Sequence, residues 1–181
     1  MNTDIHDGQD IRNPKCLCLI SLGSNLGDPA ANIQRAFGDL QKLSSALFQE
    51  SSLWQSTPVD CPPGSPDFIN AAVAFAPLEN ETPESLLAKL WQIEIQFGRQ
   101  SKTILNEPRP LDLDLIAFKN HTRTTESLTL PHPRFHQRRF VLEPLNEITP
   151  LAILPGQTQT IAQLLAALDM DETLTLHSAN G

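Results

Sequence analysis

Two aspartates stand one residue apart in an otherwise apolar run. The stretch "EPRPLDLDLIAF" spans residues 107–118 and places Asp112 and Asp114 among leucines. On a β-strand, residues i and i+2 point to the same face, about 7 Å apart. We therefore expect both carboxylates on one face, and the two like charges predict a positive group beside them. On the other face, toward a core, we expect Leu111, Leu113, Leu115 and Ala117.

Three kinds of chemistry suit such a pair of carboxylates. They could be a general acid and base, a structural pair neutralised by arginines, or ligands of Mg²⁺, which prefers carboxylate oxygens and commonly bridges substrate phosphates. Arg99 and Arg109 flank the strand, and Arg138 and Arg139 follow it. Arginines beside metal-binding carboxylates indicate a polyphosphate between them. The residues alone leave phosphoryl transfer and a structural salt-bridge cluster both open, while the missing G-x-x-x-x-G-K-[ST] pattern excludes a P-loop enzyme.

The charge distribution favours a local anion site over a nucleic-acid-binding surface. The 181-residue chain has a formal net charge of −8, which argues against general nucleic-acid binding. Residues 99–139 nevertheless hold eight of the 13 Lys and Arg and only four of the 21 Asp and Glu. One basic segment in an acidic chain is typical of a site for a bound anion. Chance clustering on a solvated face is the alternative.

The length of the chain suits one domain with a substantial core. No apolar run approaches the roughly 18 residues of a membrane span, and the N-terminus lacks the basic start and apolar centre of a secretory signal. We expect a cytoplasmic protein with a flexible N-terminal tail over residues 1–14, a single domain over 15–170 and a C-terminal tail over 171–181. Cys16, Cys18 and Cys61 provide no disulfide framework, and we expect the first two to be buried in a strand.

The order of predicted elements points to an α+β fold. Buried strands are predicted over residues 16–23, 46–56 and 68–78. One helix is predicted to begin with Asp28 as N-cap and Pro29, and another with Thr82 as N-cap and Pro83, ending at Gly98. Together with the aspartate strand this gives β-α-β-β-α-β, the ferredoxin-like pattern. Two further helices are predicted over 134–148 and 160–169.

Five stretches occur in the order in which one enzyme family carries them. They are "LGSNLGD", "STPV", "PDFINAAVAF", "GRQSKTILNEPRPLDLDLIAF" and "LPHPRFHQRRFVLEPLNEITP". Over residues 16–168 the sequence resembles 6-hydroxymethyl-7,8-dihydropterin pyrophosphokinase, a folate-pathway enzyme. The resemblance implies a ferredoxin-like α+β sandwich with a mainly antiparallel sheet and helices packed on it. It also implies transfer of pyrophosphate from ATP to the hydroxymethyl group of the pterin, with release of AMP.

The resemblance assigns roles to individual residues. It implies that Asp112 and Asp114 bind two Mg²⁺ ions, and that Arg99 and Arg109 bind phosphates and are catalytic together with the aspartates. On the side of ATP, the co-substrate, it further implies Glu94, Lys102, Leu115, Thr129, His132 and Arg138. On the pterin side it implies Thr57, Pro58, Asp60, Phe68, Asn70 and Phe140. The expected partners are these two small molecules, without nucleic acid or membrane, and the expected state is a monomer or weak homodimer.

The chain departs from the family pattern just before Pro108 and Arg109. Where active relatives usually carry Trp-Gly, this sequence has Asn106 and Glu107, and the glutamate adds a negative charge near a triphosphate. This difference motivates a second hypothesis, a degenerate relative that binds pterin or nucleotide with little catalysis. A third hypothesis, from a different class, is a ferredoxin-like interaction module with no small-molecule site.

Overall fold

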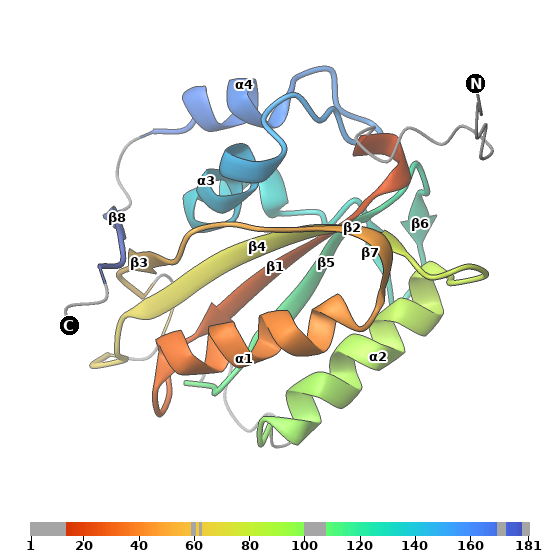
Figure 1. Cartoon of the computed structure of the whole chain (residues 1–181). Coiled ribbons are helices and arrows are strands. Elements are labelled where there is room, and N and C mark those ends of the chain that lie inside the picture. Colours follow the sequence, from red (N-terminus) through yellow and green to blue (C-terminus); the bar gives the residue numbers. More distant parts are fainter. Residues whose placement is uncertain (1–13, 59–60, 62, 100–107, 170–172, 179–181) are drawn as a thin grey trace, which may run out of the picture.

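An antiparallel sheet forms the centre of the molecule (Figure 1). The computed structural model describes residues 14–58, 61, 63–99, 108–169 and 173–178. Strands pair in the order β5-β1-β4-β3-β8, and β2 also pairs with β4, further along that strand than β3. The bounds are β1 Cys18–Ser24, β2 Ser44–Glu50, β3 Trp54–Ser56, β4 Phe68–Pro77, β5 Asp112–Phe118 and β8 Leu174–Leu176.

The order of elements along the chain confirms the ferredoxin-like prediction. The helices are α1 Pro29–Gln41, α2 Pro83–Gln96, α3 Arg139–Ile148 and α4 Ile161–Ala166. In Figure 1, α1 and α2 cover one face of the sheet, and α3 and α4 lie on the other. One core cluster accordingly joins Ile20 and Val73 to α1 and α2, and a second joins Leu19 and Ala74 to α3 and α4. Because both faces of the central strands are covered, these strands are nearly continuous apolar runs.

Both predicted helix starts are present. Asp28 Oδ1 accepts a hydrogen bond from the Ala31 N–H at 3.0 Å, with proline in the first turn. Thr82 and Ser85 cap the start of α2 reciprocally, each side chain accepting from the other residue's backbone N–H. After α2, Gly98 has φ +92°, a conformation that favours glycine and ends the helix.

The strand predicted over residues 46–56 is interrupted and forms β2 and β3. Between them, the Ser51 N–H donates to the Ala72 carbonyl at 2.9 Å, and Ser51 Oγ accepts from the Ala72 N–H at 2.9 Å. The hydroxyl thus replaces a backbone acceptor in the ladder, which serine side chains do readily. The prediction of one continuous strand is therefore wrong at this point.

β5 departs from regular alternation near its end. Its pairing with β1 shifts between Leu19, which pairs with Ala117, and Ile20, which pairs with Leu115. Ile116 is therefore an extra residue on β5, a β-bulge that turns the following side chains over. Leu115 lies in the core under α1 and α2 as expected, but Ala117 lies in the core under α3 and α4. The prediction that Ala117 shares a face with the leucines is wrong.

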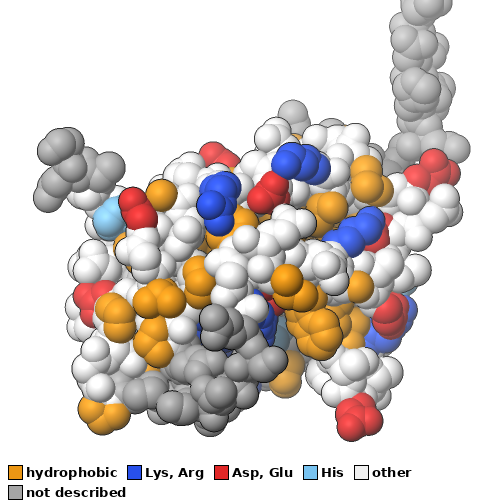
Figure 2. Space-filling model, turned by 90° about the horizontal axis from the view of Figure 1, so that it is seen from below, with side chains coloured by type: hydrophobic (Ala, Val, Ile, Leu, Met, Phe, Trp, Pro, Cys, Tyr) orange, Lys and Arg blue, Asp and Glu red, His pale blue; other side chains and the backbone are white. Residues whose placement is uncertain are grey.

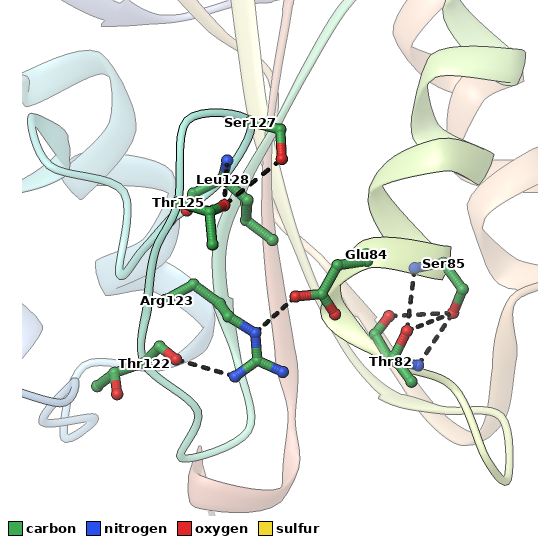
Figure 3. A network of polar contacts seen from close by, with 8 residues as sticks. All are labelled: Thr82, Glu84, Ser85, Thr122, Arg123, Thr125, Ser127 and Leu128. Carbon is green, nitrogen blue, oxygen red and sulfur yellow. Dashed lines mark hydrogen bonds and ion pairs between the residues drawn. The ribbon is translucent and has the colours of Figure 1, made fainter.

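A small hairpin is tethered to the start of α2 (Figure 3). It consists of β6 Arg123–Thr124 and β7 Thr129–Leu130. Arg123 Nε donates to Glu84 Oε1 at 2.6 Å, and in the turn Thr125 Oγ1 accepts from the Leu128 N–H at 3.1 Å. The ion pair holds the hairpin beside α2, so the residues of its turn and of β7 extend along one side of β5.

The remaining segments differ from the expectations in detail. Short 3-10 turns lie at Pro14–Cys16 and Phe135–Gln137, the latter just before α3. Cys16 therefore lies in a turn, whereas Cys18 is buried in β1 as expected. The segment expected to be a C-terminal tail contains β8, which pairs with β3. Among the residues described, no helix combines the length and the apolar character needed to cross a membrane.

Candidate active site

Asp112 and Asp114 lie at the start of β5, beside the end of β1. They pair with Gly23 and Ser21 respectively. A Cβ atom added at Gly23 would lie 3.7 Å from atoms of both Asn70 and Phe68. Glycine at this position therefore leaves open the space between the aspartate strand and β4, and that space is part of a cavity.

The first cavity has a volume of about 240 Å³ and brings together residues expected on the pterin side. These are Thr57, Phe68, Asn70 and Phe140. It is also lined by Ser21, Leu22, Gly23, Ser56, Cys61 and Gln137. Two aromatic side chains and several polar groups in one concave site suit a flat heterocyclic ligand.

Asn70 has a fixed orientation in the wall of this cavity. Its side chain is only 3 % exposed. Its Nδ2 donates to Ser56 Oγ at 2.8 Å and to the Trp54 carbonyl at 3.4 Å. Because both hydrogen bonds point the amide nitrogen toward β3, the amide oxygen faces Gly23 and can accept a hydrogen bond from a ligand.

The second cavity, of about 470 Å³, brings together residues expected on the ATP side. Arg99, Leu115, Thr129 and His132 all line it. Its wall is mixed. Apolar side chains come from α2, β5 and the hairpin, namely Leu87, Trp91, Leu113, Leu115 and Leu128, whereas arginines and carboxylates occupy much of the remainder. Such a division suits a ligand with a flat apolar end and a highly charged end.

Five charged residues line both cavities. They are Arg109, Asp112, Asp114, Arg134 and Arg138. The two cavities therefore adjoin at a group of three guanidinium groups and two carboxylates. Guanidinium groups bind phosphates through paired hydrogen bonds, and carboxylates bind the divalent ions that accompany polyphosphates. The junction can thus hold the reacting part of a phosphorylated ligand between two binding cavities.

Two arginines provide the positive charge predicted beside the first aspartate, Asp112. Arg109 Nη1 lies 2.7 Å from Asp112 Oδ1, and Arg99 Nη1 lies 3.9 Å from the same oxygen. Arg99 also forms an ion pair with Glu94 of α2. The other oxygen of Glu94 accepts a hydrogen bond from the Leu113 N–H at 2.8 Å. These contacts join α2 to β5 directly beneath the junction.

Glu94 does not line the second cavity but contacts two residues of its wall, Arg99 and Leu113. The side chain is 1 % exposed. Burial raises the pKa of its carboxyl group to about 7, because desolvation outweighs the Leu113 hydrogen bond and the pairing with Arg99. Glu94 is therefore a buried partner of Arg99, which differs from the expected position lining the nucleotide pocket.

The end of β1 positions Arg109. Ser24 Oγ donates to the Pro110 carbonyl at 2.6 Å. Asn25 Oδ1 accepts from the Arg109 N–H at 2.9 Å, and the Asn25 N–H donates to the Arg109 carbonyl at 3.2 Å. Ser24 and Asn25 are both buried. The "LGSNLGD" stretch therefore does more than turn the chain, since it anchors the segment that carries Arg109.

His132 is held neutral at the edge of the second cavity. Burial, followed by the charges of Arg138 and Arg134, lowers the pKa of its imidazole to about 4. Its Nδ1 accepts a hydrogen bond from the Arg134 N–H at 3.3 Å. The proton of the neutral ring then resides on Nε2, which makes His132 a hydrogen-bond donor at neutral pH.

Not every expected site residue takes its expected place. Pro58 follows Thr57 in the chain but lines neither cavity. Asp60 and Lys102 lie outside the described residues, as do Asn106 and Glu107.

The structure also adds residues that the sequence did not single out. Arg134 lines both cavities, Ser56 and Gln137 line the first, and Trp91 lines the second. For Arg134 a signal was available, because it follows His132 and Pro133 in a segment already assigned to the ATP side. Trp91 and Ser56 carried no signal, since one lies on a helix surface and the other in a strand.

Comparison with known proteins identifies the family. The model of the 7,8-dihydro-6-hydroxymethylpterin-pyrophosphokinase (HPPK) family matches residues 19–150. A Synechocystis protein named 2-amino-4-hydroxy-6-hydroxymethyldihydropteridine pyrophosphokinase is 36% identical over 151 residues, which cover 83% of this chain and 75% of the relative. A Haemophilus influenzae protein of the same name is 38% identical over 148 residues, which cover 81% of this chain and 89% of the relative.

Solved structures share the fold. Wild-type Plasmodium falciparum HPPK-DHPS with pteroate superimposes with a TM-score of 0.64 at 14% sequence identity, over 83% of this chain and 42% of the larger protein. An HPPK-DHPS in complex with substrates has a TM-score of 0.65 at 13% identity, over 83% and 42% of the two chains. The match covers less than half of these solved chains. From its family match, its relatives and its fold, the chain belongs to the 7,8-dihydro-6-hydroxymethylpterin-pyrophosphokinase family.

Proposed function

We propose that this protein transfers a pyrophosphoryl group from ATP to the hydroxymethyl group of 6-hydroxymethyl-7,8-dihydropterin and releases AMP. The observation that carries this proposal is the set of five charged residues shared by the two cavities. The pterin occupies the first cavity and ATP the second, so that the β-phosphorus lies at the junction. There the hydroxymethyl oxygen bonds to the β-phosphorus and loses its proton to water. The bond between the β-phosphorus and the oxygen that joins it to the α-phosphorus breaks, and AMP leaves with that oxygen.

The arginines act on the charge that develops during transfer. Arg99 and Arg109 are held in place by Glu94 and Asp112, so little reorganisation is needed when the phosphates bind. Arg134 and Arg138 also border the junction. Positioned cations of this kind stabilise a transition state more than they stabilise the bound substrates.

The aspartates fit Mg²⁺ as the metal of the reaction. Mg²⁺ binds through one or two carboxylates together with waters and substrate phosphates. Among the described residues, no group of three or more His, Cys, Asp or Glu side chains could hold a metal ion, which favours binding shared with ATP over a cage made of protein alone. We propose that Asp112 and Asp114 are ligands of two Mg²⁺ ions. When bound, the metal neutralises phosphate charge and lowers the pKa of the attacking hydroxyl.

Product analysis tests the proposed function. The protein is incubated with ATP, Mg²⁺ and 6-hydroxymethyl-7,8-dihydropterin, and the nucleotides are separated. We expect equal amounts of AMP and pterin diphosphate, and neither product without pterin or with excess chelator. Release of ADP would instead indicate transfer of a single phosphoryl group. Binding of both ligands without AMP would identify a degenerate relative, and binding of neither would favour an interaction module.

A further inference from the structure

Glu147 near the end of α3 is held by donors from the segment that connects β2 to β3. The Ser52 N–H donates to its Oε1 and Oε2 at 3.0 and 3.1 Å, and Ser52 Oγ donates to Oε1 at 2.7 Å. The indole Nε1 of Trp54 donates to Oε2 at 3.2 Å. Hydrogen bonds to a carboxylate are shorter and stronger than those between neutral groups. Glu147 of α3 is thus bound both to Trp54, the first residue of β3, and to Ser52 in the segment before that strand.

The same two elements each contribute a residue to the wall of the first cavity. On α3, Phe140 lies seven residues before Glu147 and so on the same side of the helix, about two turns away. On β3, Ser56 lies two residues after Trp54 and so on the same side of the strand. Phe140 and Ser56 both line the cavity. Helix and strand are therefore joined by the Glu147 contacts, and each also presents a residue to the cavity on the same side as those contacts.

Two residues of β3 also accept hydrogen bonds from the Asn70 side chain. Trp54 pairs with Asn70 across β3 and β4, and the Trp54 carbonyl and Ser56 Oγ both accept from the Asn70 amide. β3 is only three residues long and pairs with β4 on one side and β8 on the other, so the Glu147 contacts add a side-chain restraint to this short backbone pairing. A shift at Trp54 would therefore move both acceptors that orient Asn70 and would widen the cavity.

We infer that Glu147 is a positioning residue that sets the width of the first cavity and the orientation of Asn70. It acts through Trp54 and Ser52 and does not itself touch the cavity. This inference rests on the proposed function, in which that cavity binds the pterin. Ligand sites depend on supporting contacts that hold wall residues to within about 0.5 Å. Loss of the Glu147 contacts is therefore expected to weaken pterin binding and to leave ATP binding unchanged.

Binding measurements on Glu147→Gln test the inference. Isothermal titration gives the Kd of 6-hydroxymethylpterin in the presence of a non-hydrolysable ATP analogue and Mg²⁺, and separately the Kd of the analogue. We expect the pterin Kd to rise about fivefold to tenfold and the analogue Kd to stay within about twofold. The matched control is Asp39→Asn, which removes a carboxylate of α1 that accepts from Lys42 outside both cavities and should change neither Kd.

Two further variants separate positioning from stability. Trp54→Phe and Ser52→Ala each remove a donor and keep the carboxylate, so they should weaken pterin binding in the same sense even if Glu147→Gln does not fold. In the Trp54→Phe background, the effect of Glu147→Gln should shrink, because the two groups act together. A lower Tm of Glu147→Gln with an unchanged pterin Kd would overturn the inference, and so would equal weakening of both ligands. A wild-type protein that binds the analogue but no pterin would overturn the proposed function itself.

Discussion

Asp112 and Asp114 are the residues at which charge is expected to decide activity. Replacement by asparagine keeps the size of each side chain and removes the negative charge. We expect Asp112→Asn and Asp114→Asn each to lower kcat by at least about a hundredfold, which corresponds to a loss of roughly 3 kcal/mol of transition-state stabilisation. The measurement is AMP release at saturating Mg²⁺, with circular dichroism to show that the variants fold and Asp39→Asn, a carboxylate of α1 outside both cavities, as the control. Near wild-type kcat in either variant would show that the two carboxylates do not bind the catalytic metal.

His132 is expected to make the folded state sensitive to acid. Its pKa is lowered to about 4 in the folded protein, against about 6.5 for an unfolded histidine. Between these values the unfolded state binds more protons at this histidine, so the penalty from His132 is absent above about pH 6.5 and lowers the free energy of unfolding as pH decreases toward 4. The raised pKa of Glu94, about 7, acts in the opposite sense, so the effect of His132 is read from the difference between variant and wild type. Asp112 opposes the shift, whereas Arg138 and Arg134 reinforce it. Denaturant unfolding at several pH values should show a smaller loss of stability in His132→Gln than in wild type.

The control for this pH dependence is a histidine at the surface. His121 is exposed and contacts the edge of the Phe118 ring. His121→Gln is measured over the same pH range, which gives the effect of replacing a surface histidine by glutamine. If His132→Gln keeps the wild-type slope, other groups cause the acid sensitivity of the protein.

Individual site residues can be predicted from the sequence where their type and spacing indicate a chemical role. The aspartates and the arginines beside them are such residues, and they lie together in the structure. The roles of Ser24 and Asn25 could not be predicted, because their partners Arg109 and Pro110 lie more than 80 residues further along the chain. Glu147 carried no signal for the same reason, since only the packing of α3 against β3 reveals what it binds.

Among the elements, α2 is expected to supply a contact for the adenine ring. Its Trp91 lines the second cavity and is 58 % exposed, and Ile95 one turn later is also exposed. Figure 2 shows the molecule from below the view of Figure 1, and on that surface hydrophobic side chains lie among charged ones. Packing of a base on an aromatic ring contributes about 1–3 kcal/mol. We therefore expect Trp91→Ala to weaken ATP binding about tenfold and to leave binding of tripolyphosphate unchanged.

Fluorescence gives a direct measurement of this contact. The chain has two tryptophans, so Trp54→Phe leaves Trp91 as the only one. In that variant, ATP with Mg²⁺ should change the emission of Trp91, because the base displaces water from the indole, whereas tripolyphosphate should not. Equal responses to the two ligands would place the adenine ring elsewhere.

The elements that the sequence predicts correctly are those with local signals. The proline and cap at the start of α1 and α2, and the glycine after α2, are read within a few residues. The bulge at Ile116 is not, because it exists only in the pairing of β5 with β1. The division of β2 from β3 and the addition of β8 likewise depend on strands that lie side by side in space.

For the whole molecule, the shared junction predicts that the two substrates bind cooperatively. Arg109 is already paired with Asp112, but Arg134 and Arg138 also border both cavities, and a bound triphosphate attracts both of these guanidinium groups. With Arg134 and Arg138 drawn to the phosphates, a pterin that binds second meets a wall that is already in place. Coupling free energies between two sites are commonly about 1–3 kcal/mol. We therefore expect saturating non-hydrolysable ATP analogue with Mg²⁺ to lower the Kd of 6-hydroxymethylpterin by at least about fivefold, and pterin to lower the Kd of the analogue by the same factor.

Arg134→Ala tests whether the junction carries this coupling. Removal of one guanidinium group leaves the aromatic wall of the first cavity and the apolar wall of the second intact, so each ligand alone should still bind. The factor by which one ligand tightens the other should fall in the variant, and isothermal titration of each ligand with and without its partner measures it. Lys42→Ala, which removes a surface cation that pairs with Asp39 outside both cavities, should keep the wild-type factor. Independent binding in the wild-type protein would mean that the five shared residues separate the two ligands instead of bringing them together.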